Sequence, residues 1–176
     1  MFYKFLKFIF YFLVALFLVT AQLALINYPW FSFLRPNLFV AVISAIMMRN
    51  SHGQIVWFSF CLFFMLDLFS ANNFGFYFFS GTVSTLLIYW FFKELFSKQT
   101  IWSLILMITL FVLSIDTIYL FLIYLLNNFS LVESVNYFDF FVKMLIEIFS
   151  SVILGLLIYL STDLILKKIN KKYIIN

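Results

Sequence analysis

Four carboxylates lie in or beside long apolar segments of this chain, where a charged side chain is energetically costly and therefore informative. They are Asp67, Asp116, Asp139 and Glu147. Asp139, Lys143 and Glu147 are spaced four residues apart, so all three side chains share one face of a helix. Because the lysine can neutralise either acid, one interpretation is an ion ladder that faces the interior of a helical bundle. The alternative is a polar lining for a ligand cavity or a partner helix.

The other two acids occupy different positions. Asp116 lies midway along an apolar segment, where it is either neutral or paired with Lys143 of a neighbouring helix; a proton relay is the functional alternative. Asp67 ends another apolar segment, ahead of a turn that contains Gly75. Because Asp side chains accept hydrogen bonds from nearby backbone amides, Asp67 is expected to begin this turn and cap the next helix.

No pattern typical of catalysis or metal binding accompanies these acids. The chain has one histidine, His52, beside Gly53, and one cysteine, Cys61, so a disulfide within the chain and a cysteine-based metal site are excluded. The motifs HExxH, GxSxG and GxGxxG and a Walker loop do not occur. We therefore expect a protein that is not an enzyme, with no catalytic residues, no cofactor and no metal.

The elements that must position these residues follow from composition. The 176-residue chain is 66% hydrophobic, and only 10% of its residues are charged, against about 25% in soluble domains. A soluble protein of this size has too much surface to cover with such a composition. The chain is therefore expected to be an integral membrane protein, not a disordered chain, a disulfide scaffold or a nucleic-acid-binding domain. The formal net charge of +4 is expected to report orientation in the membrane.

Six segments are apolar around their whole circumference, which favours helices in lipid. They cover residues 5–26, 37–48, 54–69, 74–92, 101–126 and 138–166. Short connections leave no room for a soluble domain. The sequence thus predicts an all-α integral membrane protein, a six-helix transmembrane bundle with a short second helix, as a single domain over residues 1–176.

Basic residues predict the orientation of this bundle. If the six segments alternate in direction, nine of the eleven basic residues fall on the side of the N-terminus: Lys4, Lys7, Arg49, Lys93, Lys98, Lys167, Lys168, Lys171 and Lys172. The positive-inside rule then places both termini in the cytoplasm. Segment 5–26 has a signal peptide as its alternative, which leaves the later helices in the same orientation. The C-terminal lysines are interpreted as an anchor against anionic lipid headgroups or as a dock for a cytoplasmic partner.

Small residues spaced four apart indicate where helices approach closely. Ala41 and Ala45 have this spacing on the short second segment. The same spacing recurs in the pairs Ser80 and Ser84, Gly81 and Thr85, and Ser151 and Gly155. Most such pairs are expected to pack within the bundle and some to receive a partner helix, for which Ala41 and Ala45 are candidates.

Four features follow one another in order between residues 35 and 90. Arg35-Pro36-Asn37-Leu38 opens the short helix, Met48-Arg49-Asn50-Ser51-His52-Gly53 forms a brief basic loop, Leu66-Asp67-Leu68-Phe69-Ser70 ends the next helix, and Phe74-Gly75 precedes another. This stretch resembles the rod shape-determining protein MreD family. Departures from the family pattern are Asn37 in place of the usual Asp, Cys61, Phe63 and Phe64 in place of glycines, and Asn72 and Asn73 where a Pro is common.

The resemblance implies a non-enzymatic inner-membrane scaffold of the bacterial cell-elongation complex, which supports cell shape and peptidoglycan synthesis. Its implied partners are an MreC-like membrane protein, MreB filaments and a peptidoglycan synthase, and no nucleic acid. Candidate partner-binding residues are Ala41, Ala45, Asp67 and Gly75. The alternative is the substrate-binding S component of an ECF-type uptake transporter, which shares the size and the helix number. That function needs a cavity open to the outer side, where Asp67 and the 139–147 face would lie.

Overall fold

The computed structural model describes residues 2–28, 34–49, 53–70, 75–95, 100–127 and 137–173, and the side chains of residues 9–28, 34–49, 53–70, 75–94, 100–127 and 137–164. Every regular element in these ranges is an α-helix. The helices are α1 (Phe2–Asn27), α2 (Leu38–Arg49), α3 (Gln54–Phe69), α4 (Phe76–Leu95), α5 (Ile101–Asn127) and α6 (Tyr137–Tyr173). The prediction of an all-α chain with six helices and a short second helix is confirmed for this part of the chain.

Helix boundaries agree with the apolar segments to within three residues except at the end of α6. Segment 54–69 coincides with α3, and α5 begins at Ile101 as expected. Thr100 caps α5, because the Ser103 N–H donates a hydrogen bond to Thr100 Oγ1 at 3.2 Å. The last helix was predicted to end near residue 166 but continues to Tyr173. The end of the apolar stretch does not end the helix, since lysine is a good helix former and is favourable near a helix C-terminus.

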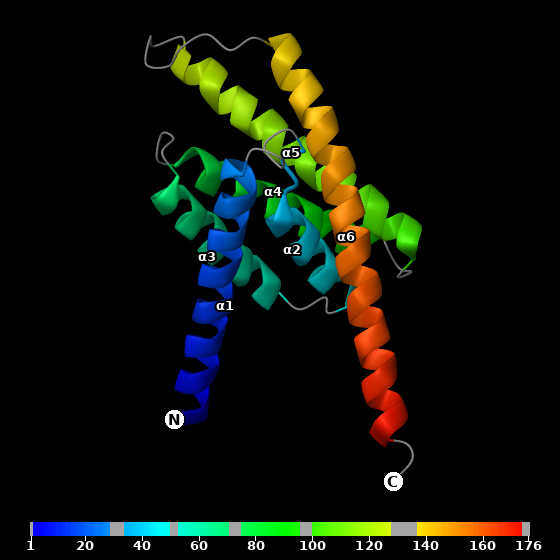
Figure 1. Cartoon of the computed structure of the whole chain (residues 1–176). Coiled ribbons are helices and arrows are strands. Elements are labelled where there is room, and N and C mark those ends of the chain that lie inside the picture. Colours follow the sequence, from blue (N-terminus) through cyan, green and yellow to red (C-terminus); the bar gives the residue numbers. More distant parts are fainter. Residues whose placement is uncertain are drawn as a thin grey trace.

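The short helix α2 lies at the centre of the molecule (Figure 1). It packs against α1, α3, α5 and α6, while α3, α4, α5 and α6 pack in chain order around it. Phe39, Ile43, Met47 and Met48 of α2 are at most 1% exposed. A helix of 12 residues is only about 18 Å long, but burial among other helices means that it needs little contact with lipid.

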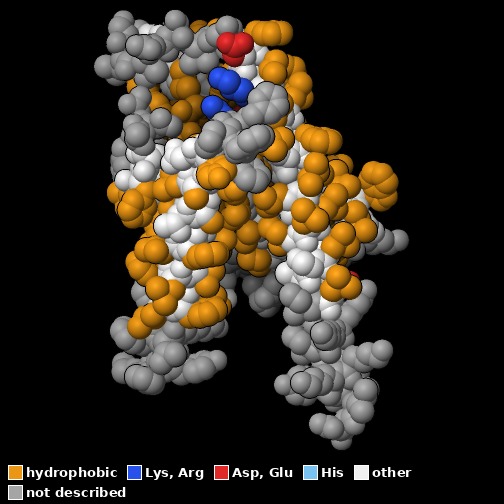
Figure 2. All heavy atoms as spheres, in the orientation of Figure 1, with side chains coloured by type: hydrophobic (Ala, Val, Ile, Leu, Met, Phe, Trp, Pro, Cys, Tyr) orange, Lys and Arg blue, Asp and Glu red, His pale blue; other side chains and the backbone are white. Residues whose placement is uncertain are grey.

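Three helical stretches are long and apolar enough to cross a membrane: Ile9–Asn27, Ile101–Asn127 and Tyr137–Leu164. Large apolar side chains remain exposed on these helices; Phe17 is 70% and Trp102 is 79% exposed. Figure 2 shows such hydrophobic side chains over most of the visible face of the described residues. The described helices therefore indicate a helical, multi-pass membrane protein.

The start of α1 and the end of α6 lie at the same end of the molecule (Figure 1). The end of α5 and the start of α6 lie at the opposite end, which we call the distal end.

Candidate functional site: a polar cavity where α2 begins

The start of α2 is held inside the molecule by side chains of other helices. The first backbone N–H groups of a helix have no partner within the helix, and non-helical backbone at membrane depth must find partners in protein or water. Here the Asn37 N–H donates to Ser151 Oγ at 2.8 Å, and the Leu38 N–H donates to Gln22 Oε1 at 2.8 Å. Asn37 itself caps the helix by accepting the Val40 N–H at Oδ1, 3.3 Å away.

The carbonyl groups of the segment before α2 have partners of the same kind. Gln22 Nε2 donates to the Pro36 carbonyl at 3.3 Å, and Ser150 Oγ donates to the Leu34 carbonyl at 2.6 Å. Between them lies Arg35 with a positive φ of 39°, which is uncommon for a residue other than glycine. Helices α1 and α6 thus fix residues 34–38 from both sides.

Glu147 joins this cluster from α6. Its Oε1 accepts a hydrogen bond from Asn37 Nδ2 at 3.0 Å, which brings the carboxylate to the N-terminus of α2, the positive end of the helix dipole. Among the described residues the structure gives an ion pair between Arg49 and Asp163 and none between Lys143 and either Asp139 or Glu147. The structure therefore fits the polar-lining interpretation better than an ion ladder along α6.

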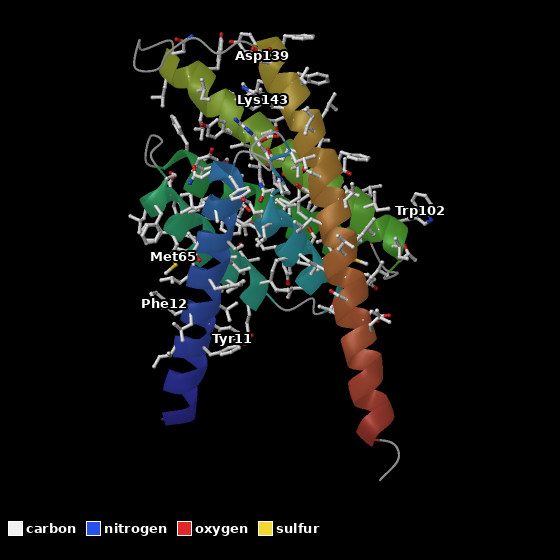
Figure 3. All side chains as sticks on the ribbon, in the orientation of Figure 1. Tyr11, Phe12, Met65, Trp102, Asp139 and Lys143 are labelled. Carbon is white, nitrogen blue, oxygen red and sulfur yellow. The ribbon has the colours of Figure 1, made fainter. Side chains whose placement is uncertain are left out.

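A cavity of about 660 Å³ opens beside this cluster at the distal end. Helices α1, α3, α4, α5 and α6 and the segment before α2 contribute to its wall. Its charged lining residues are Arg35, Asp116, Asp139, Lys143 and Glu147. Figure 2 shows basic and acidic side chains at a hollow on this end, and in Figure 3 Asp139 and Lys143 extend from α6 toward the side of α5. The face of α6 predicted from spacing is thus a wall of the cavity.

Asp116 brings an unsatisfied carboxylate to the cavity. Its Oδ2 is buried and has no hydrogen-bond partner, and the residue is part of the cavity wall. One turn further along α5, the ring of Tyr119 stacks on that of Tyr77 with centroids 5.3 Å apart, and both tyrosines line the same cavity. A carboxylate next to stacked aromatic rings is a combination that suits a cationic group.

Asp67 and Gly75 form the turn between α3 and α4. The carboxylate of Asp67 accepts the backbone N–H of Gly75 and, at 3.3 Å, that of Tyr77. Gly75 has a φ of 102°, a backbone conformation that favours glycine. Asp67 is only 2% exposed. This geometry agrees with the capping interpretation, and it leaves little of the Asp67 side chain accessible to a partner.

Ala41 and Ala45 lie inside the chain, which corrects their expected position on a partner-facing surface. Ala41 is fully buried and Ala45 is 4% exposed. A Cβ added to Gly155 of α6 would lie 3.7 Å from that of Ala41 and would collide with Ile108 of α5. Likewise, a Cβ on Gly81 of α4 would collide with the ring of Phe63 on α3. These small residues therefore serve close packing between helices of this chain.

Sequence reasoning missed Gln22, Ser150 and the Tyr77–Tyr119 pair. Gln22 carried a usable signal, since an uncharged polar side chain inside an apolar helix needs a partner there. The tyrosines carried none, because aromatic residues are frequent throughout this chain. His52, whose lack of a second metal ligand was noted from the sequence, lies outside the described residues.

Comparison of the chain with known protein families, with curated proteins and with solved structures finds no match. The class defined by fold and composition is thus a helical, multi-pass membrane protein with a polar cavity at one end.

Proposed function

We propose that this protein is an MreD-like scaffold of the bacterial cell-elongation complex, located in the cytoplasmic (inner) membrane with both termini inside the cell. It performs no chemistry and acts by binding an MreC-like membrane protein, and through it MreB filaments and the peptidoglycan synthase. The arrangement of α1 and α6, which start and end at the same end of the molecule, is consistent with this topology (Figure 1).

The observation that carries the proposal is the role of the residues on which the resemblance rests. Asp67 and Gly75 form the turn into α4. Asn37, which stands where the family usually has Asp, caps α2 and contacts α6. Turn residues and a single Asp are weak evidence in a sequence, since any helical hairpin can use them. They support the resemblance more strongly here because each of these residues determines how a helix begins. A shared order of such residues is expected between proteins that share this arrangement.

The burial of Ala41 and Ala45 moves the expected partner surface to the outside of the bundle. A single-span partner would then contact outward side chains such as Phe17 of α1, Trp57 of α3, Trp102 of α5 or Phe149 of α6, all at least 69% exposed. A photo-crosslinking amino acid at each of these four positions in native membranes distinguishes a partner face from lipid-facing surface. The four sites serve as controls for one another, because all are exposed and apolar.

The test is purification of the full chain from its native membrane, followed by identification of the proteins that accompany it. We expect a single-span protein with a periplasmic coiled coil, crosslinked from one of the four faces only. Recovery of an energy-coupling transmembrane subunit with ATPases would refute the scaffold role.

The cavity favours one second candidate, the S component of an ECF-type transporter, since such a protein needs a substrate cavity at the outer side. Its volume of about 660 Å³ is within the range of small-molecule sites, roughly 300–1,000 Å³. The same purification separates the two candidates through the proteins recovered.

A further inference from the structure

We propose that the distal cavity binds a zwitterionic molecule, whose amine lies against Asp116 and the tyrosine pair while its anionic group meets Lys143. Neither the scaffold role nor the transporter role assigns this ligand chemistry. The proposal does not depend on the elongation complex, so its failure would leave the scaffold proposal untouched.

The inner wall of the cavity has the chemistry to bind a cation with hydrogen-bond donors. A buried carboxylate oxygen without a partner is costly, and Asp116 Oδ2 is such an atom. An ammonium group at the cavity face of Asp116 supplies the opposite charge that this buried carboxylate lacks. Glu147 is the second acid of this wall, but its Oε1 is already engaged by Asn37. The stacked rings of Tyr77 and Tyr119 add the attraction of aromatic faces for a cation.

The rim of the cavity has a basic side chain that can bind an anion. Lys143 and Arg35 are exposed and line the cavity, whereas Asp116 and Glu147 are partly buried. Asp139 is exposed at the same rim. Since Lys143 forms no ion pair with Asp139 or Glu147, its ammonium remains available to a carboxylate or phosphate. A lysine at a site of this kind acts as a point charge for such groups.

The two ends of the cavity thus select opposite charges in a fixed order, amine inward and anion outward. A purely anionic ligand would bring a negative group toward Asp116 and Glu147, and a purely cationic one would leave Lys143 without a partner. The remaining wall is mostly apolar, which suits an attached hydrocarbon. Two sources share this chemistry: the headgroup of an aminophospholipid and a free soluble amino acid or phosphoamine.

The test uses the purified full chain and two probes. O-phosphorylethanolamine represents the soluble source, and its binding is measured by equilibrium dialysis of the protein in detergent. Phosphatidylethanolamine represents the lipid source, and its retention is measured by native mass spectrometry after reconstitution in bilayers of phosphatidylglycerol. The variants are Asp116→Asn and Lys143→Gln. The control is Glu94→Gln, which removes one exposed carboxylate of α4 outside the cavity lining.

We expect at least one probe to bind, with affinity or retention at least tenfold lower in both Asp116→Asn and Lys143→Gln and unchanged in Glu94→Gln. Binding of the soluble probe identifies a free zwitterion, and binding of the lipid alone identifies a headgroup. Because Lys143 is exposed, Lys143→Gln keeps the test decisive if Asp116→Asn impairs folding. Binding of neither probe, or binding that both variants leave at the wild-type level, would overturn the proposal.

Discussion

Replacement of Asp67 by alanine tests whether the turn into α4 is built as described. The carboxylate accepts two backbone N–H groups, those of Gly75 and Tyr77, and the side chain is 2% exposed. Loss of a helix cap alone costs about 1 kcal/mol. A hydrogen bond to a charged group is worth roughly 1.5–3 kcal/mol. One such bond, from Gly75, and a longer, weaker one of about 0.5–1 kcal/mol from Tyr77 put the expected loss of unfolding free energy for Asp67→Ala at about 2–4 kcal/mol.

Two further variants separate this effect from a general sensitivity of the turn. Asp67→Asn keeps one acceptor oxygen and is expected to lose about half as much, roughly 1–2 kcal/mol. Ser70→Ala removes a hydroxyl that donates to the Asp67 carbonyl at 3.1 Å in the same turn. Its cost is expected to stay near 1 kcal/mol or less, as for an ordinary neutral hydrogen bond.

The assay is reversible unfolding of the purified chain from mild detergent into mixed micelles of rising denaturing-detergent content, followed by tryptophan fluorescence. We expect the order of stability wild type, Ser70→Ala, Asp67→Asn, Asp67→Ala. If Asp67→Ala were as stable as Ser70→Ala, the carboxylate would not hold the start of α4, and the structural basis given above for the resemblance would weaken with it.

Other parts of the structure give further expectations. Gly81→Ala should lower the yield of folded protein, because even a Cβ at this position collides with the ring of Phe63, whereas the same change at Gly75, where a Cβ meets no atom within 4 Å, should cost backbone strain alone; folded yield after membrane extraction compares the two. Gln22→Leu should destabilise the chain by about 2–4 kcal/mol, since it removes one partner each from Pro36 and Leu38, and the unfolding assay above measures this. Reporter fusions at residue 176 and within the 128–136 connection should report opposite sides of the membrane, with the C-terminus inside; an external C-terminus would refute the proposed topology.

The helices of this fold could be predicted from the sequence because apolar runs and their interruptions are local properties. The start of α5 was placed correctly, since Thr100 precedes an apolar run and caps it. Asp67 was expected to cap the next helix for a similarly local reason, its position eight residues before Gly75 at the end of an apolar segment. The end of α6 was placed too early, because lysines continue a helix beyond the last apolar residue.

The side of each helix that packs against its neighbours was much harder to predict from the sequence. A helix that is apolar around its circumference gives no periodic signal for the side that faces its neighbours. Ala41 and Ala45 were therefore recognised as a close-packing pair but assigned to an external partner, although α2 is surrounded by its own chain. Charges at intervals of four residues do carry such a signal, and Asp139, Lys143 and Glu147 of α6 line the cavity together, although no ion pair joins them as a ladder would require. The encounter of Glu147 with Asn37, 110 positions apart, could not be read from either segment alone.

The short helix α2 connects the two ends of the molecule through α6. At its first turn, Asn37 bonds Glu147 and Ser151. At its last residue, Arg49 donates to the Tyr159 carbonyl at 3.3 Å and lies 3.7 Å from the carboxylate of Asp163. Polar contacts at both ends, with Ala41 facing Gly155 between them, hold α2 in a fixed register along α6. A shift of one helix along the other would break bonds at both ends together, so α2 and α6 are expected to move as one rigid pair.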